Sequence, residues 1–291
     1  MSVLISKIKI LLDLVVFKHS LFALPFLFSS MLIAFKLSNE LNIIFVCKCI
    51  ILGIIAAISA RSFAMATNRL MDEDIDKNNP RCKNRPNITG TIGRKNVYYF
   101  IIANAIIFII TCYFINSLTF NLSIPILIIL ALYSSFKRFS SLSHLVLGLC
   151  LGLAPVAASI MVLEKIELYS VLLCFGVMFW TAGFDLLYSL QDMKYDQKVG
   201  LYSIPSQFGL NASLFISMLC HVLAVLFWLL FVWVAPIGYI SFLGVVICAI
   251  ILYYEQKIVR KDFAKIDKAF FTLNAYLSVI FFVFIYLDLV F

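Results

Sequence analysis

Two short stretches of this sequence carry acidic residues at a regular spacing of four. The first contains Asn68, Asp72 and Asp76, and the second contains Asp192 and Asp196. In a helix, residues four apart lie on one face, with their Cβ atoms about 5–6 Å from one another. Carboxylates at that separation repel unless a cation lies between them, and their oxygens are the hard ligands that Mg²⁺ prefers. The spacing therefore predicts that these five side chains bind Mg²⁺.

Basic residues accompany both acidic stretches. Carboxylates that hold a metal, next to Arg and Lys that hold phosphate oxygens, are what a magnesium–diphosphate site needs. We expect the four aspartates to be catalytic through the metal, and the diphosphate to be bound by Arg69, Arg81, Lys83, Arg85 and Lys194. Lys18 could also reach the diphosphate, but snorkelling at a membrane surface explains it equally well. For either stretch alone, a solvated loop in which acids and bases pair is the alternative.

The composition places these motifs in a membrane protein. Of the 291 residues, 63% are hydrophobic and only 13% are charged. A soluble domain has about half apolar and a quarter charged residues, so the apolar excess must face lipid. The net charge of +8 does not indicate nucleic acid binding, because the basic residues lie in short stretches between apolar runs. None of the eight cysteines forms a C-x-x-C pair, which argues against a zinc site or a disulfide framework.

The apolar runs are long enough to cross a bilayer. A membrane span needs about 20 mostly apolar residues, and a lipid-facing backbone must satisfy its own hydrogen bonds. We therefore predict an all-α integral membrane protein with nine transmembrane helices, at about 20–36, 42–66, 97–116, 119–135, 142–163, 167–190, 211–231, 234–254 and 269–290. Residues 1–18 are expected to form an amphipathic interfacial helix that leads into the first span.

The distribution of basic residues predicts the orientation. With nine spans, one side of the membrane receives the N-terminus and the connections that carry both acidic motifs. Nineteen of the 23 basic residues fall on that side, three on the other, and Arg61 lies within a span. The positive-inside rule then places the N-terminus and both motif loops, at 67–96 and 191–210, in the cytoplasm. No stretch is long enough for a soluble domain, so residues 1–291 are expected to form a single membrane domain.

A few other residues stand out singly. Asp185 lies inside the sixth predicted span, where an acid is costly and points by default to function. Arg138 follows the fourth span and can bind a carboxylate with two hydrogen bonds. Its neighbour Lys137 fits a membrane anchor as well as a ligand-binding residue. His144 and His221 have no partner at metal-ligand spacing and are interpreted as packing residues.

The motifs resemble those of the UbiA superfamily of intramembrane prenyltransferases, which carry N-x-x-x-D-x-x-x-D in one loop and D-x-x-x-D in another. Arg85–Pro86 and the D-x-x-Y-x-x-x-D pattern of Asp185–Asp192 also look like the family. YSSFKRFSSL at Tyr133–Leu142 is similar to a Y-P-F-x-K-R stretch of the 4-hydroxybenzoate polyprenyltransferase branch, and FKHSLFALPF at Phe17–Phe26 to that branch's first helix. The resemblance covers nearly the whole chain.

The resemblance implies a nine-helix bundle around a substrate chamber, in the cell inner (cytoplasmic) membrane, with the active site open to the cytoplasm. It also implies transfer of a prenyl group from a polyprenyl diphosphate to an aromatic acid such as 4-hydroxybenzoate, in respiratory quinone biosynthesis, with two Mg²⁺ ions. The acceptor-binding residues would be Arg138, Lys137, Asp185 and Tyr188, with Tyr188 lining the chamber.

The resemblance also has departures and rivals. Arg69, Cys82 and Ser134 stand where many members have Asp, Thr and Pro. YSLQD followed by GLYSIP, at 188–192 and 200–205, looks like bacterial and archaeal relatives, some of which serve menaquinone synthesis, so a naphthoate acceptor is an alternative. A CDP-alcohol phosphotransferase would need a D-G-x-x-A-R motif, which the chain lacks. A cation-coupled transporter would hold its acids near the membrane midplane, whereas these acids lie at one rim.

Overall fold

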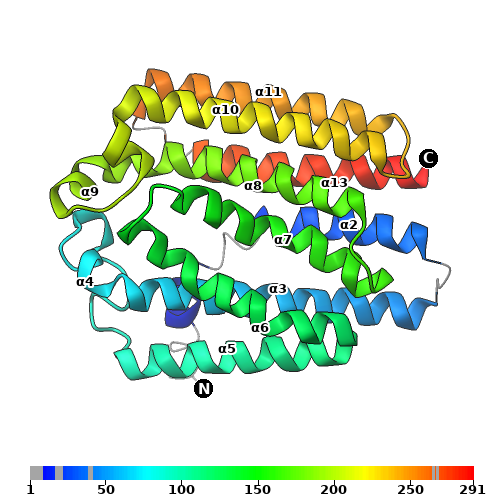
Figure 1. Cartoon of the computed structure of the whole chain (residues 1–291), viewed down its shortest axis with the longest axis horizontal. Helices are drawn as coiled ribbons and strands as arrows, with labels where there is room; N and C mark the ends of the chain where they lie inside the picture. The colour runs from blue at the N-terminus through cyan, green and yellow to red at the C-terminus, as the bar shows by residue number, and fades with distance from the viewer. Residues whose placement is uncertain (1–8, 17–21, 39–41, 264–265, 267–268) are drawn as a thin grey trace. The chain divides into compact units, whose positions relative to one another are not determined.

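The helices of the chain follow the predicted apolar runs (Figure 1). A computed structural model describes residues 9–16, 22–38, 42–263, 266 and 269–291, and these contain no strand. The longer helices are α2 (Leu24–Leu37), α3 (Ile43–Met71), α5 (Arg94–Ile115), α6 (Ser117–Leu132), α7 (Ser143–Leu163), α8 (Leu168–Ser189), α10 (Ile204–Val234), α11 (Ile240–Lys261) and α13 (Asn274–Val290). The shorter elements are α4 (Glu73–Asp76), η2 (Pro80–Cys82), η3 (Tyr133–Arg138), η4 (Leu190–Asp192), α9 (Met193–Val199) and the π-helical η6 (Ala269–Leu273).

The chain divides into two compact units. Unit 1 consists of Met1–Ser20 and Ile50–Ser135, and unit 2 of Leu21–Cys49 and Phe136–Phe291. The first acidic motif belongs to unit 1 and the second to unit 2, and each is described within its own unit. The expectation of a single membrane domain stays a prediction.

Eight of the nine predicted spans correspond to segments that are long and apolar enough to cross a membrane. The exception is the first, where α2 has 14 residues. At 1.5 Å per residue such a helix is about 21 Å long, whereas the hydrocarbon core is about 30 Å thick. The all-helical membrane fold is thus confirmed, while the ninth span and the orientation of the N-terminus stay predictions.

The two segments predicted as loops contain helical structure. Residues 67–71 extend α3 and residues 94–96 begin α5, while α9 and the start of α10 lie within 191–210. Ser203 begins α10 with a capping box, in which its side chain accepts from the Ser206 N–H. Gly209, with a φ of 77°, then interrupts the helix. This break lies close to residue 211, where the sequence places the start of the seventh span.

Unit 1 is held by α5 and α6, which pack side by side (Figure 1). Asn116 begins α6 with a capping box, and Thr119 Oγ1 also donates to the Cys112 carbonyl 2.9 Å away, which ties α6 to the end of α5. Residues 9–14 are helical, within the segment predicted to be interfacial. Leu14 and Val15 are buried in a small core beside Ala66. Two apolar side chains of this segment therefore contact protein, and its interfacial role stays a prediction.

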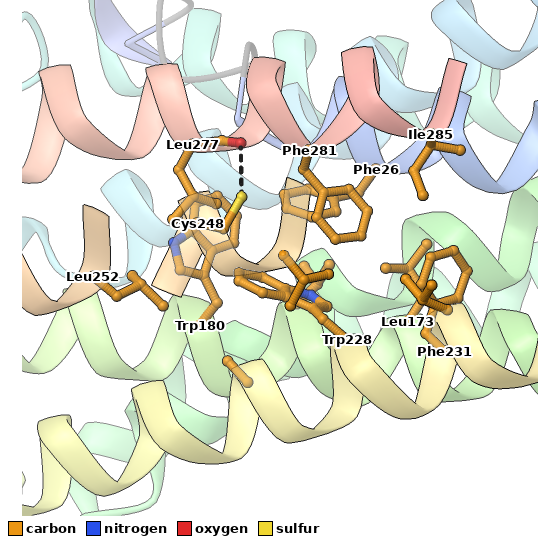
Figure 2. Close-up of a cluster of buried hydrophobic side chains, with 14 of the residues drawn as sticks. Phe26, Leu173, Trp180, Trp228, Phe231, Cys248, Leu252, Leu277, Phe281 and Ile285 are labelled. Carbon is orange, nitrogen blue, oxygen red and sulfur yellow. Dashed lines mark hydrogen bonds between the residues drawn. The ribbon is translucent and has the colours of Figure 1, made fainter. Parts of the chain in front are cut away.

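Unit 2 has a core of aromatic rings between α2, α8, α10 and α13 (Figure 2). Phe26 lies at its centre, with its ring centroid 5.1 Å from Trp180, 5.9 Å from Trp228 and 4.9 Å from Phe281. Aromatic pairs at such separations add stabilisation beyond the area they bury. This core fixes the position of α8, whose end carries the second acidic motif.

Two glycines set the register between α7 and α8. A Cβ on Gly148 would lie 2.2 Å from the Met178 carbonyl oxygen, and one on Gly152 would lie 2.5 Å from the Cys174 carbonyl oxygen. Only glycine lets the two backbones approach this closely, as small residues do between membrane helices generally. The contacts run in opposite directions along the two helices, so the start of α7 lies opposite the end of α8.

Reporter tags test the membrane topology. The positive-inside distribution and a spanning α2 place a tag before residue 1 and a tag at 77–79 on the cytoplasmic side, and a tag after residue 291 on the opposite side. Accessibility of engineered tags to a membrane-impermeant label in intact and opened cells measures this. A short α2 that fails to cross would move only the N-terminal tag to the far side. The C-terminal tag serves as the control, because an odd number of spans separates it from residues 77–79 in both cases.

Candidate active site

The first acidic motif begins at the end of α3 and continues into α4. Although α3 ends at Met71, the Asp72 N–H donates to the Asn68 carbonyl at 2.9 Å, and the Asp76 N–H donates to the Asp72 carbonyl at 2.7 Å. These helical hydrogen bonds preserve the stacking that the four-residue spacing predicts. Both aspartates are buried, at 2% and 4% exposure. Burial of two carboxylates is costly unless each has a partner.

The partners are side chains of the same motif. Asn68 Nδ2 donates to Asp72 Oδ2 at 2.8 Å, and the Arg85 guanidinium forms an ion pair with Asp76 Oδ2. The structure therefore brings Asn68, Asp72, Asp76 and Arg85 together as one polar cluster. A cation that bound the aspartates would meet oxygens already gathered, with Arg85 alongside to bind a phosphate.

The other basic residues of this motif differ in their surroundings. Arg69 is buried, and its Nε donates to the Leu14 carbonyl at 3.4 Å. Arg81 and Lys83 are exposed on and just after η2, where Asn79 Oδ1 accepts from the Arg81 N–H. Arg69 is thus anchored within unit 1, while the two exposed side chains point to solvent. Lys18 lies outside the described residues. The diphosphate role of all four stays a prediction.

The second motif lies on η4 and α9, directly after α8. Asp192 precedes the first residue of α9 and Asp196 lies within it, so the four-residue spacing again falls on helical backbone. Both are half-buried, and Lys194 between them is exposed. Ser203 Oγ donates to Asp196 Oδ2 at 3.1 Å, and the Leu201 N–H donates to the Asp196 carbonyl at 2.9 Å. The turn into α10 therefore positions the Asp196 carboxylate.

The segment with Lys137 and Arg138 is tied to the same turn. The Tyr202 N–H donates to the Lys137 carbonyl at 2.8 Å. The Lys137 ammonium and Asp192 both act electrostatically on the Asp196 carboxylate. Arg138 is exposed at the end of η3. Unit 2 thus places the predicted acceptor-binding cations beside the second acidic pair.

Asp185 has a partner that sequence reasoning missed. His144 Nδ1 lies 2.7 Å from Asp185 Oδ2, across the α7–α8 contact. The interpretation of His144 as a packing residue is therefore wrong, because its imidazole binds Asp185, an acid inside the sixth predicted span. A sequence signal did exist: His144, Gly148 and Gly152 recur at four-residue spacing and so share the face of α7 that contacts α8. His221 is buried in the core, where its Nδ1 lies 3.1 Å from Gln256 Nε2.

Tyr188 links the motif to the aromatic core. Its ring stacks on Phe270 with centroids 4.3 Å apart, and Phe270 in turn contacts Phe184 and Phe22. Tyr188, four residues before Asp192, is thus packed against the aromatic core of unit 2.

The described residues contain no group of three or more Asp, Glu, His or Cys side chains that could hold a metal ion. Each motif instead offers one pair of carboxylates. The donors present are oxygen atoms of Asp and Asn, which fit Mg²⁺ and not a soft metal.

Comparisons with known proteins give a consistent answer. A model of the UbiA prenyltransferase family matches residues 22–285. The 4-hydroxybenzoate octaprenyltransferase of Francisella tularensis subsp. novicida (strain U112) is 26% identical over 207 residues, which cover 71% of this chain and 72% of that protein. The enzyme of the same name from Methylobacillus flagellatus is 27% identical over 214 residues, or 72% of this chain and 71% of the other.

Solved structures share the fold. The apo structure of a UbiA homolog from Aeropyrum pernix K1 superposes with a TM-score of 0.82 at 27% identity, covering 93% of this chain and 98% of the other. A UbiA homolog from Archaeoglobus fulgidus, solved with GPP and Mg²⁺ bound, has a TM-score of 0.69 at 18% identity, over 97% of this chain and all of the other (100%). At that identity the second likeness concerns the fold alone.

The Asp76–Arg85 ion pair predicts a specific pattern of stability. Arg85→Ala leaves a buried carboxylate without its cation and should cost up to about 3 kcal/mol. Adding Asp76→Asn removes the charge, so the double variant should be more stable than Arg85→Ala alone. Thermal unfolding in detergent with EDTA measures both. Lys77→Ala, which removes an exposed pair with Glu73, is the matched control and should change stability by less than about 0.5 kcal/mol. Strictly additive losses in the double variant would contradict the pairing.

Proposed function

The chain belongs to the UbiA prenyltransferase family and is a prenyltransferase; from this premise we propose that it transfers a polyprenyl group from a polyprenyl diphosphate to the ring of an aromatic acid. The observation that carries the proposal is the pair of acidic motifs, each with two carboxylates four residues apart on helical backbone. Family membership also excludes the two alternative functions, a cation-coupled transporter and a CDP-alcohol phosphotransferase.

We propose that Asp72, Asp76, Asp192 and Asp196, with Asn68, hold two Mg²⁺ ions against the diphosphate. When bound there, Mg²⁺ supplies positive charge that neutralises the diphosphate as it leaves. The A. fulgidus homolog is solved with GPP and Mg²⁺ bound, which supports a prenyl diphosphate and Mg²⁺ as the pair of ligands and leaves the residues a proposal. The basic residues Lys18, Arg69, Arg81, Lys83, Arg85 and Lys194 are proposed to bind phosphate oxygens and so stabilise the same developing charge.

The reaction then needs an electron-rich ring close to the allylic carbon. As the C–O bond of the donor breaks, diphosphate takes the electron pair and a ring carbon forms the new C–C bond. We assign the acceptor to unit 2, where Arg138 and Lys137 would hold its carboxylate near Asp185 and Tyr188. The contact between the Lys137 carbonyl and Tyr202 supports this, because it links the cationic segment to the second metal motif. Tyr188 would line the chamber that takes the apolar tail.

The names of the relatives favour 4-hydroxybenzoate as the acceptor and ubiquinone biosynthesis as the pathway. A naphthoate acceptor for menaquinone uses the same chemistry and remains the alternative proposal. The basic loops support a cytoplasmic opening of the site, in the inner membrane of a bacterial cell. An assay of purified protein with radiolabelled geranyl diphosphate against hydroxybenzoates and hydroxynaphthoates tests acceptor and activity together.

The acidic motifs predict dependence on magnesium. Activity should vanish in EDTA and return with Mg²⁺, because oxygen donors select a hard cation. Asp72→Ala and Asp196→Ala should each lower kcat by about 10²–10³-fold, the scale for one lost electrostatic contact in the transition state. The matched control is Asp74→Ala, an exposed acid two residues from Asp72 that is not part of the stack. Full activity in chelator, or equal losses in Asp74→Ala, would refute the metal assignment.

Arg138 predicts a different kinetic effect. Its carboxylate contact forms before the reaction and holds substrate and transition state alike, so Arg138→Ala should raise the KM of the acceptor with little change in kcat. Loss of a charge-assisted hydrogen bond of about 1.5–3 kcal/mol corresponds to roughly 10–100-fold. Steady-state kinetics with each substrate varied in turn separates the two KM values. Lys198→Ala, an exposed cation of α9, is the control. A raised KM for the donor instead would make Arg138 a diphosphate ligand.

A further inference from the structure

The pair formed by His144 and Asp185 joins α7 to α8 in unit 2. His144 Nδ1 lies 2.7 Å from Asp185 Oδ2, with side-chain exposures of 6% for His144 and 22% for Asp185. The imidazole is therefore less accessible to solvent than the carboxylate. Any ligand that reaches this pair meets Asp185 first.

The hydrogen bond settles which imidazole nitrogen carries the proton. A carboxylate can only accept, so Nδ1 must carry a hydrogen and donate it. Among the described residues, Nε2 is buried and has no hydrogen-bond partner. His144 is consequently a donor that holds Asp185 Oδ2 and leaves Oδ1 for a ligand.

The backbone fixes this arrangement. His144 lies one turn before Gly148 on α7, where α7 approaches α8 too closely to admit a Cβ. The two helices cannot slide without breaking that contact, so the carboxylate is held in one place. Such rigid support from a second residue is what orients a reactive group.

The surroundings are those of the proposed acceptor site. Tyr188 lies one turn beyond Asp185 on α8, and the Lys137–Arg138 segment precedes His144 by a few residues. His144 is also near enough to Asp196 to act electrostatically on its carboxylate. Asp185 therefore belongs to the same unit as the residues proposed to hold the acceptor and as Asp192 and Asp196.

We propose that Asp185 is the general base of the reaction and that His144 is its positioning residue; this rests on the proposed function. Asp185 Oδ1 takes the proton of the acceptor's ring hydroxyl, and the O–H electron pair moves into the ring. The ring carbon next to the hydroxyl-bearing carbon then bonds to the allylic carbon, whose C–O pair leaves with diphosphate. A dienone results, which regains aromaticity when the ring proton moves to oxygen. Asp185 returns its proton to water.

A base matters here because the neutral hydroxyl activates the ring far less than its anion does. A positioned base is worth about 10²–10⁴-fold in rate. The requirement disappears for an acceptor whose hydroxyl is already ionised in solution. The proposal thus predicts that replacing Asp185 lowers kcat less for a more acidic acceptor. A purely structural role of Asp185 would lower kcat equally for both acceptors.

The test compares 4-hydroxybenzoate with the more acidic 2,6-difluoro-4-hydroxybenzoate, with geranyl diphosphate and Mg²⁺ saturating. With 4-hydroxybenzoate, Asp185→Asn should lower kcat by about 10²-fold or more. With the fluorinated acceptor, the ratio of wild-type to variant kcat should shrink at least tenfold. The same ratio for both acceptors would overturn the proposal. So would a higher Mg²⁺ requirement in Asp185→Asn, because that would make Asp185 a metal ligand.

Variants of His144 provide a second, independent arm. His144→Leu removes the donor and should lower kcat in the same acceptor-dependent way, while His144→Asn, whose amide N–H can replace Nδ1–H, should recover most of the loss. His221→Leu is the matched control, since it removes a buried imidazole elsewhere in unit 2 and should leave the ratio between the two acceptors unchanged. Equal kinetics in His144→Leu and His144→Asn would overturn the positioning role, even if Asp185→Asn failed to fold. A wild-type protein that prenylates neither of these acceptors, nor a hydroxynaphthoate, would instead refute the proposed function itself.

Discussion

Carboxylates held out of water need partners. This requirement determines the local structure of both acidic motifs and of the contact between α7 and α8. Asp72 accepts from Asn68, Asp76 pairs with Arg85, Asp185 pairs with His144, and Asp196 accepts from Ser203. Each partner comes from the same unit as its acid. The carboxylates are thus preorganised before any cation or substrate arrives, so little ordering remains to be done on binding.

The apolar parts of the chain serve the same end. A helix in lipid satisfies its own backbone groups, so polar chemistry can gather only where helices end or where they pack against protein. The rings of unit 2 pack against one face of α8 (Figure 2), and the glycines of α7 fix α8 through a second contact. Together they determine where the last turns of α8 present Asp185 and Tyr188.

The sequence predicts much of this and misses particular things for physical reasons. Hydropathy finds the spans because lipid imposes a length on them, and spacing finds the acidic stacks because a helix repeats every 3.6 residues. Neither reveals that α2 is short or that α10 begins at Ile204, since capping and kinks shift helix ends without changing hydropathy. The contact between His144 and Asp185 joins residues 41 positions apart. This contact depends only on the register of α7 and α8. That register in turn requires that Gly148 and Gly152 carry no Cβ.

The link between Tyr202 and Lys137 is made by main-chain atoms alone: an N–H and a carbonyl oxygen 2.8 Å apart. Its strength does not depend on which side chains stand at those two positions. Residues 137 and 138 can therefore be substituted in the course of evolution while the backbone of η3 keeps its position beside Asp196. Side-chain substitutions at these two positions can therefore change the acceptor specificity. The backbone that positions the Asp196 carboxylate would stay unchanged.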